Sequence, residues 1–189
     1  TFVGLGAHVD AVELNLVDPM EYFKRWWGPF IELTVRDNVQ SAGGDLSDSD
    51  ASVLAFISDV AGMTAIDHLR VQLHEREKIH RAFADVFLQH DLLLTATTPS
   101  VAFAHPGPEG GPVEVAGKRV REPSLDNQRC TEAVSHAGYP AVSVPCGFSP
   151  EGLPIGLQII GPHGADAAVL RAAAAFETAQ PWADRWPGK

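Results

Sequence analysis

Two short apolar runs lie close together in the last third of this 189-residue sequence. Residues 141–146 read AVSVPC, residues 153–160 read LPIGLQII, and a Gly- and Pro-rich stretch separates them. Runs of this length bounded by turn residues predict two adjacent β-strands. A further apolar run at residues 91–99 ends in Pro99, which predicts a buried strand that opens into a loop.

Helical patterns alternate with these strands. Thr64 and Asp67 have the spacing of a capping box, and an apolar stripe predicts a helix from residue 65 to about residue 90. Helices are also predicted at residues 124–136 and at the Ala-rich residues 165–179. This alternation predicts an α/β fold in which helices cover a mixed sheet. Three or four strands are few for such a sheet, so we expect the fold to be incomplete without strands from elsewhere.

Three further local patterns predict short elements. Residues 9–16 alternate apolar and polar side chains, which predicts a half-buried strand. Asp18-Pro19 has the pattern of an N-cap followed by Pro in the first helical turn, and Gly28-Pro29 is expected to break or kink the helix that follows. Residues 113–120 predict a small hairpin that turns at Ala116-Gly117.

Length and composition allow residues 1–189 to form one domain. With 45% hydrophobic and 20% charged residues, a chain this long can bury a core without disulfides or metal. Residues 41–52 are small, polar and acidic, which predicts an exposed flexible connector. The sequence begins at Thr1 rather than Met, as expected from Met removal, from proteolytic maturation or from a piece of a longer polypeptide.

The charge balance limits the possible partners. A net charge of -10 argues against nucleic acid, because phosphate backbones are bound by clustered Lys and Arg. No apolar run approaches the roughly 20 residues that cross a bilayer, and no signal peptide pattern is visible, so no membrane partner is expected. Cys130 and Cys146 form no C-x-x-C motif, and the expected location is the reducing cytoplasm.

The eight histidines do not predict a metal site. The densest set is His68, His74 and His80, and steps of six residues on a helix turn the three side chains about 120° apart. They cannot share one ion, so neither a metal nor another cofactor is predicted. His105 and His136 lie beside loop segments and could line a pocket, although a packed or exposed histidine is the more common case.

Candidate nucleophiles are few. The sequence has no G-x-S-x-G elbow, and Cys146 in Pro-Cys-Gly is explained more simply as a small buried side chain than as a reactive thiol. Thr1 would supply a hydroxyl and an α-amine together, as in N-terminal-nucleophile hydrolases. A hydrolase that uses Thr1 therefore stays open as an alternative.

Residues 138–162 read GYPAVSVPCGFSPEGLPIGLQIIGP, a segment that strongly resembles the C-terminal part of the amidase signature family. Residues 91–99, DLLLTATTP, are similar to the family's Asp-x-Leu-Leu-x-Pro-Thr-x-Pro strand, and Arg76 lies at the family's usual spacing before it. Phe176-Glu177 and Pro181-Trp182 are similar to the family's closing helix and tail. The resemblance extends from Val9 to Trp182.

The resemblance implies a hydrolase that cleaves carboxylic amide C–N bonds with a Lys, a cis-peptide Ser and a nucleophilic Ser. The family carries these residues in an N-terminal part with a Gly-Gly-Ser-Ser-Gly-Gly signature, which this sequence lacks, so no catalytic residue is assigned to this chain. The chain is expected to be the C-terminal part of an amidase, inactive alone, that supplies strands and pocket walls. An N-terminal amidase segment, on the same precursor or on a partner chain, would complete it and cover exposed apolar surface. A homo-oligomer is a further possibility.

In the family, the helix before Gly138-Tyr139-Pro140 faces the substrate, so the resemblance gives Gln128 and Thr131 as substrate-binding candidates. Polar residues on a solvated face are an equally good explanation. Glutamine amidotransferase subunits of the family resemble Asp-x-x-Thr-x-x-x-Asn, and here Gln128 and Ser135 replace the Asp and the Asn. Because an acid suited to a substrate ammonium group is absent, the pattern favours a general amidase of an undefined small amide. The rival hypothesis is a non-catalytic subunit or remnant that binds amide-like ligands or a partner protein.

Overall fold

The computed structural model describes residues 1–16, 18–49, 51–104, 113–115, 117–120 and 126–185, which form two compact units. The helical unit is Leu16–Ile79, and the sheet unit combines Thr1–Asn15 with His80–Lys189. The helical unit contains α1 (Pro19–Ser41), η2 (Leu46–Asp48), α2 (Ala51–Asp59), α3 (Ala65–Arg70) and the π-helical turn η3 (Val71–Glu75), and α4 (Arg76–Phe87) continues from it into the sheet unit. The sheet unit contains η1 (Phe2–Leu5), β1 (Leu93–Ala96), β2 (Val113–Val115), β3 (Lys118–Val120), α6 (Arg129–Ala137), β4 (Ala141–Phe148), β5 (Pro154–Ile160) and α7 (Asp166–Ala179).

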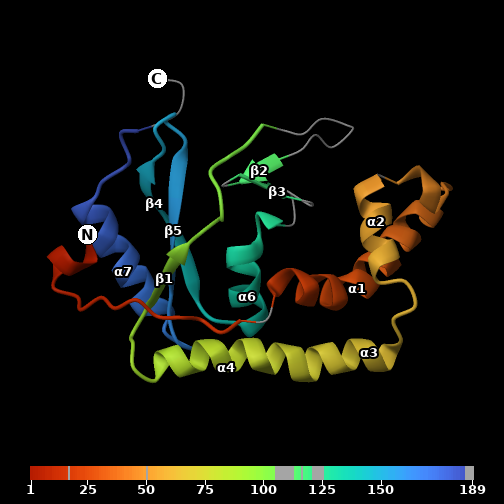
Figure 1. Cartoon of the computed structure of the whole chain (residues 1–189), viewed down its shortest axis with the longest axis horizontal. Helices are drawn as coiled ribbons and strands as arrows, with labels where there is room; N and C mark the ends of the chain where they lie inside the picture. Colours follow the sequence, from red (N-terminus) through yellow and green to blue (C-terminus); the bar gives the residue numbers. More distant parts are fainter. Residues whose placement is uncertain (17, 50, 105–112, 116, 121–125, 186–189) are drawn as a thin grey trace. The chain divides into compact units, whose positions relative to one another are not determined.

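The main sheet has three strands in the order β1-β5-β4, with β5 between the other two (Figure 1). Both pairings are antiparallel, and β2 and β3 form a separate antiparallel hairpin. The strands predicted at residues 91–99, 141–146 and 153–160, and the hairpin at 113–120, are confirmed, although residue 116 of the hairpin lies outside the described residues. The predicted α/β class is confirmed.

One face of the main sheet packs on α7. Strand residues alternate between the two faces of a sheet, and Val144 and Ile159 point to the same face as the apolar side chains of α7. There they form a buried core with Ala173 and Phe176, and the Phe2 ring of η1 lies 5.5 Å from that of Phe176. This apolar layer anchors the N-terminus and fixes the register of the sheet, because a slip by one residue would turn these side chains to the other face.

Helix α1 begins where the sequence predicts it. The Asp18 carboxylate accepts a hydrogen bond of 2.9 Å from the Met20 amide, and Pro19 occupies the first helical position, where its missing N–H costs nothing.

Helix α1 continues through Gly28-Pro29 to Ser41, so the predicted break does not occur, while a kink at this point stays a prediction. Pro29 has no N–H for the Arg25 carbonyl four residues earlier, which is the usual reason that Pro ends a helix. Here the His68 Nδ1 lies 3.4 Å from that carbonyl oxygen, and Gln72 Nε2 lies 2.8 Å from His68 Nε2. A ring that donates through Nδ1 and accepts through Nε2 supplies a long hydrogen bond in place of the missing one.

Gly28 allows α1 to approach Val60 closely. A Cβ at this position would lie 2.7 Å from Val60 Cγ2 and 2.9 Å from Val60 Cβ, with Val60 Cγ1 closer still. No real Cβ tolerates such contacts, so the absence of a side chain at residue 28 is required by packing.

We therefore expect Gly28→Ala to lower the free energy of unfolding by about 1–3 kcal/mol, as overpacking does. At an ordinary helix position the same change would raise it, because Ala is the better helix former. Urea unfolding measures the difference. In a Val60→Ala background the loss from Gly28→Ala should be smaller, because only the contact with the Cβ of residue 60 at 2.9 Å remains, and stabilisation in the wild-type background would refute the close contact.

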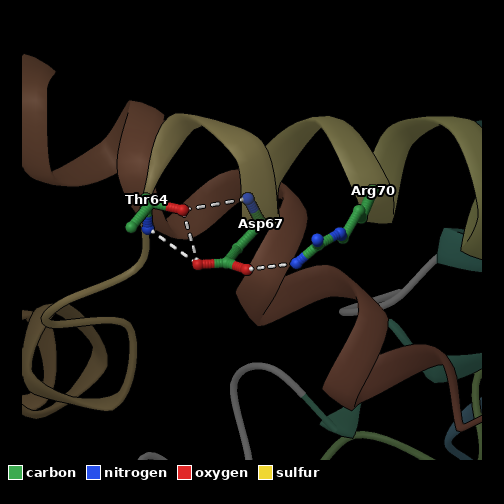
Figure 2. Close-up of polar contacts among 3 residues, drawn as sticks. All are labelled: Thr64, Asp67 and Arg70. Carbon is green, nitrogen blue, oxygen red and sulfur yellow. Dashed lines mark hydrogen bonds and ion pairs between the residues drawn. The ribbon is translucent and has the colours of Figure 1, made fainter.

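The helical run from residue 65 begins with the predicted capping box (Figure 2). The Asp67 amide donates to Thr64 Oγ1 at 3.2 Å, and the Thr64 amide and hydroxyl both donate to Asp67 Oδ2. These bonds hold the pKa of the Asp67 carboxyl below its usual value, since they favour the charged form. Arg70, one turn later, contacts Asp67 Oδ1 at 3.3 Å. The predicted helix from 65 to about 90 is confirmed as α3, η3 and α4, which end at Phe87.

The strand predicted at residues 9–16 is wrong. This segment has no regular structure, and Val9 and Val12 are exposed rather than half-buried on a sheet. Alternation alone does not produce a strand without a neighbouring strand to pair with.

Residues 41–49 are mostly exposed, as expected for the connector at 41–52, and include η2 with its own capping box between Asp45 and Asp48. Residue 50 lies outside the described residues, and flexibility of the segment stays a prediction, as does a single domain over residues 1–189. No helix in the described ranges combines the length and the apolar character needed to cross a bilayer.

Candidate functional site

The second face of the main sheet carries polar side chains. Thr95 of β1 and Ser143 of β4 are both paired with Gln158 of β5, so the three side chains project from the same face. This face is opposite to the apolar layer that packs on α7. We call this row of hydroxyl and amide groups the polar face.

Gln158 is the centre of the polar face. This residue is only 4% exposed, and its side-chain amide nitrogen donates hydrogen bonds to Thr95 Oγ1 at 2.9 Å and to the Cys130 carbonyl at 3.0 Å. Both amide protons are used, so burial of the Gln158 amide leaves no donor unsatisfied. The two hydrogen bonds connect β5 to β1 and to α6.

Gly156 lets two hydroxyls meet above β5. Thr97 follows β1, its amide donates to the Gly156 carbonyl at 3.0 Å, and its Oγ1 lies 2.7 Å from Ser143 Oγ of β4. A Cβ on Gly156 would lie 2.7 Å from Thr97 Oγ1 and 3.1 Å from Ser143 Oγ. The hydroxyl contact between the two outer strands therefore depends on the missing side chain in the middle strand.

The predicted pocket residues lie at the start of α6. Gln128 is the N-cap residue with an exposed side chain, and the Thr131 hydroxyl donates to the Gln128 carbonyl at 3.0 Å. Cys130 lies between them in sequence, and Gln158 holds its carbonyl. The structure thus fixes this helical turn against the polar face. A substrate-binding role for Gln128 and Thr131 stays a prediction.

His105 and His136, the two histidines that could line a pocket, have different outcomes. His136 is buried in α6, with Nε2 3.0 Å from Glu132 Oε2 one turn earlier. This places it in the packed part of the helix. His105 lies outside the described residues. Among the described residues, no group of three or more His, Cys, Asp or Glu side chains is placed to hold a metal ion.

Of the two candidate nucleophiles, Thr1 is held by a side-chain hydrogen bond and Cys146 packs against the apolar layer on α7. The Thr1 hydroxyl donates to Gln180 Oε1 at 2.7 Å, and Gln180 Nε2 donates to the Cys146 carbonyl at 2.6 Å. The hydroxyl proton of Thr1 is thus directed to Gln180, so the α-amine does not receive it in this conformation. Burial raises the pKa of the Cys130 thiol, which lowers its thiolate fraction at neutral pH.

Sequence reasoning did not single out Thr97, Ser143, Gly156 or Gln158 as a group. One signal was present: an isolated Gly inside a strand pattern is typical of a close approach by another group. The polar positions within the apolar runs, Ser143 and Gln158, were a second signal, because a polar residue in a buried strand needs a partner.

Comparison with known proteins decides the family. The sequence model of the family described as Amidase matches residues 56–170. This chain belongs to the amidase family. The matched region contains β1, α6, β4 and β5, and with them the whole polar face.

Curated relatives match this amidase chain over part of their own length. The chain is 41% identical over 115 residues to the A subunit of the glutamyl-tRNA(Gln) amidotransferase of Moorella thermoacetica, which covers 61% of the chain and 22% of that protein. It is 42% identical over 104 residues to the same subunit from Brevibacillus brevis, which covers 54% and 19% respectively. The chain spans about a fifth of the length of these relatives.

Solved structures agree. A bacterial aryl acylamidase of the amidase signature family superposes with a TM-score of 0.79 at 31% identity, covering 97% of this chain and 39% of that one. A 6-aminohexanoate cyclic dimer hydrolase superposes with a TM-score of 0.76 over 98% of this chain and 40% of that one, at 21% identity, which shows the fold alone. The resemblance to the amidase signature family is confirmed, and the chain corresponds to part of that fold.

Proposed function

We propose that this chain is the C-terminal part of an enzyme that hydrolyses carboxylic amide C–N bonds, and that its catalytic residues lie on another segment or chain. The observation that carries the proposal is the superposition on the aryl acylamidase, in which nearly all of this chain matches only 39% of that one. The remainder of such a fold has to hold the residues that are missing here. The four lysines, Lys24, Lys78, Lys118 and Lys189, do not lie in the family's lysine context.

In the proposed enzyme, the nucleophilic Ser of the other segment attacks the amide carbonyl. The Lys accepts the proton through the bridging Ser, returns it to the leaving amine, and water then hydrolyses the acyl-enzyme. This chain contributes one wall of the pocket, at the start of α6. Gln128 and Thr131 would contact the substrate, while Gln158 would be a positioning residue that holds their helical turn through the Cys130 carbonyl.

Reconstitution tests this proposal. The chain, the N-terminal segment of an amidase that completes it, and the two together are assayed for hydrolysis of an aryl amide such as an anilide. We expect turnover from the combination alone. Turnover by this chain in isolation, abolished by Thr1→Ala without loss of folding, would instead support the Thr1 hydrolase.

A second candidate is the glutaminase part of a tRNA amidotransferase, favoured by the 41% identity to one subunit of such an enzyme. Against it, Gln128 stands where the family's glutaminase pattern has an acid, so the charge partner for a substrate ammonium group is absent. Comparing glutamine with an uncharged aryl amide as substrates of the reconstituted enzyme separates the two. The proposal of a general amidase predicts preference for the uncharged amide.

For the reconstituted enzyme we expect Gln128→Ala to raise KM or change substrate preference while leaving the free energy of unfolding within about 0.5 kcal/mol, as for an exposed residue. The side chain is exposed, so its removal should cost little stability. Steady-state kinetics with two amides, together with urea unfolding, measures both effects. An unchanged kinetic profile would remove Gln128 from the pocket wall.

A further inference from the structure

Two histidines far apart in the sequence meet in the sheet unit. His80 lies on α4, His163 lies between β5 and α7, and the Nε2 of His163 is 3.4 Å from the Nδ1 of His80. The two ring centroids are 5.1 Å apart. The ring planes are inclined by 27°, and the two nitrogens are closer to each other than the ring centres are.

A tyrosine holds both rings in this arrangement. Tyr139 stacks on His163 with centroids 4.2 Å apart and on His80 with centroids 5.3 Å apart. Its hydroxyl donates to the His80 carbonyl at 3.2 Å, and its ring is buried against Phe83 and Phe87. The platform under the two imidazoles is therefore part of the packed core, and the rings lose little further entropy by staying in place.

The separation of the two nitrogens fits two ligands of one metal ion. In the structure the two nitrogens share a long hydrogen bond, in which either imidazole can be the donor. In a tetrahedral zinc site, Zn–N bonds of about 2.0–2.1 Å place two imidazole nitrogens about 3.3–3.4 Å apart. His163 is exposed and His80 is half-buried, so water has access to the remaining positions of an ion.

We propose that His80 and His163 form a two-histidine site for a borderline transition-metal ion such as Zn²⁺ or Cu²⁺, completed by water. The ion would bridge α4 and the segment between β5 and α7, and would stabilise the folded sheet unit without entering the amide chemistry. Imidazole is a preferred ligand of these ions, and Cu²⁺ binds more tightly than Zn²⁺ to a given set of nitrogen ligands. Both imidazoles must be neutral to bind, so affinity falls as the pH is lowered.

The test is a titration of the full chain with Zn²⁺ and with Cu²⁺ at about pH 7.5, followed by calorimetry and by the thermal unfolding midpoint. We expect one ion per chain and a rise in Tm. His163→Ala and His80→Ala should each weaken binding by about tenfold or more, because each removes one of the two protein ligands.

His8 provides the matched control. It is exposed, and its Nε2 lies 3.1 Å from Asp10 Oδ1, while His90 Nε2 lies 3.9 Å from Asp10 Oδ2, so this group is the obvious competing site in the sheet unit. His8→Ala should leave the affinity unchanged. Histidine side-chain NMR with Zn²⁺ locates the ion independently of folding, since the shifts of His80 and His163 should move together. Binding that survives His163→Ala, binding that is lost in His8→Ala, or no binding at millimolar ion would overturn the proposal.

Discussion

Gln158→Glu is expected to lower the free energy of unfolding by about 3 kcal/mol at pH 8, because it places an unpaired negative charge in a buried position. The wild-type amide donates to both Thr95 Oγ1 and the Cys130 carbonyl. A carboxylate has no proton to donate, so it would face the Cys130 carbonyl oxygen with like partial charge. Urea unfolding at several pH values measures the loss.

The destabilisation by Gln158→Glu is expected to increase as the pH rises. Burial raises the pKa of a carboxyl above its unfolded value of about 4.3, since the charged form is disfavoured. The protonated Glu can donate one hydrogen bond, so the stability of the variant should be closest to wild type below the unfolded pKa. Stability should then be lost as the pH rises through the raised pKa of the folded state. Gln158→Met, which removes both donors without a charge, should cost about 1–3 kcal/mol at every pH. Equal losses for Glu at pH 5 and pH 8 would contradict the burial of the amide.

Gly156→Ala is expected to lower the free energy of unfolding by about 1–3 kcal/mol and to separate the Thr97 and Ser143 hydroxyls. The new Cβ would lie 2.7 Å from Thr97 Oγ1 and 3.0 Å from Thr97 Cβ, so the chain after β1 has to move. Because that movement occurs on the polar face, the reconstituted enzyme should also lose turnover.

Gly147→Ala is the matched control. Gly147 lies in the neighbouring strand β4, and a Cβ at that position has open space within 4 Å. The control should stay within about 0.5 kcal/mol of wild type. If the two alanine variants were equally stable, the close approach at Gly156 would be refuted.

Local signals in the sequence predicted most of the regular elements. Asp18-Pro19 and the Thr64–Asp67 capping box start helices because the partners of each cap lie within three residues in the chain. Strands β1, β4 and β5 are apolar on the face that packs on α7, and turn residues bound them, so their extent was visible as well.

The two wrong predictions of secondary structure have a common cause. In each, the structure of a segment depends on whether a partner distant in the sequence lies beside it. Pro29 does not end α1, since His68 lies beside the carbonyl that Pro29 leaves without its usual donor. Residues 9–16 have the alternation of a strand but no strand beside them in the described structure. Neither effect is visible in a local pattern.

Only part of the candidate site could be predicted, because its contacts also join residues that are distant in the sequence. Gln128 and Thr131 came from the family resemblance, and the structure places them in the helical turn that Gln158 holds. The contacts that make the polar face join residues 28 to 63 positions apart, such as Gln158 with Cys130 and with Thr95. Spacing along a helix or a strand carries no information about such pairs.

The most direct test of the central claim is mass spectrometry of the protein purified from its source, under native and under denaturing conditions. The claim is that a second polypeptide segment supplies the lysine and serines of the amidase. It predicts that the native mass contains either a partner chain bound to the 20.3 kDa chain or a longer polypeptide that includes it, with the serine-rich signature in the added part. An amidase activity that travels with 20.3 kDa alone, or with multiples of it, would contradict the claim.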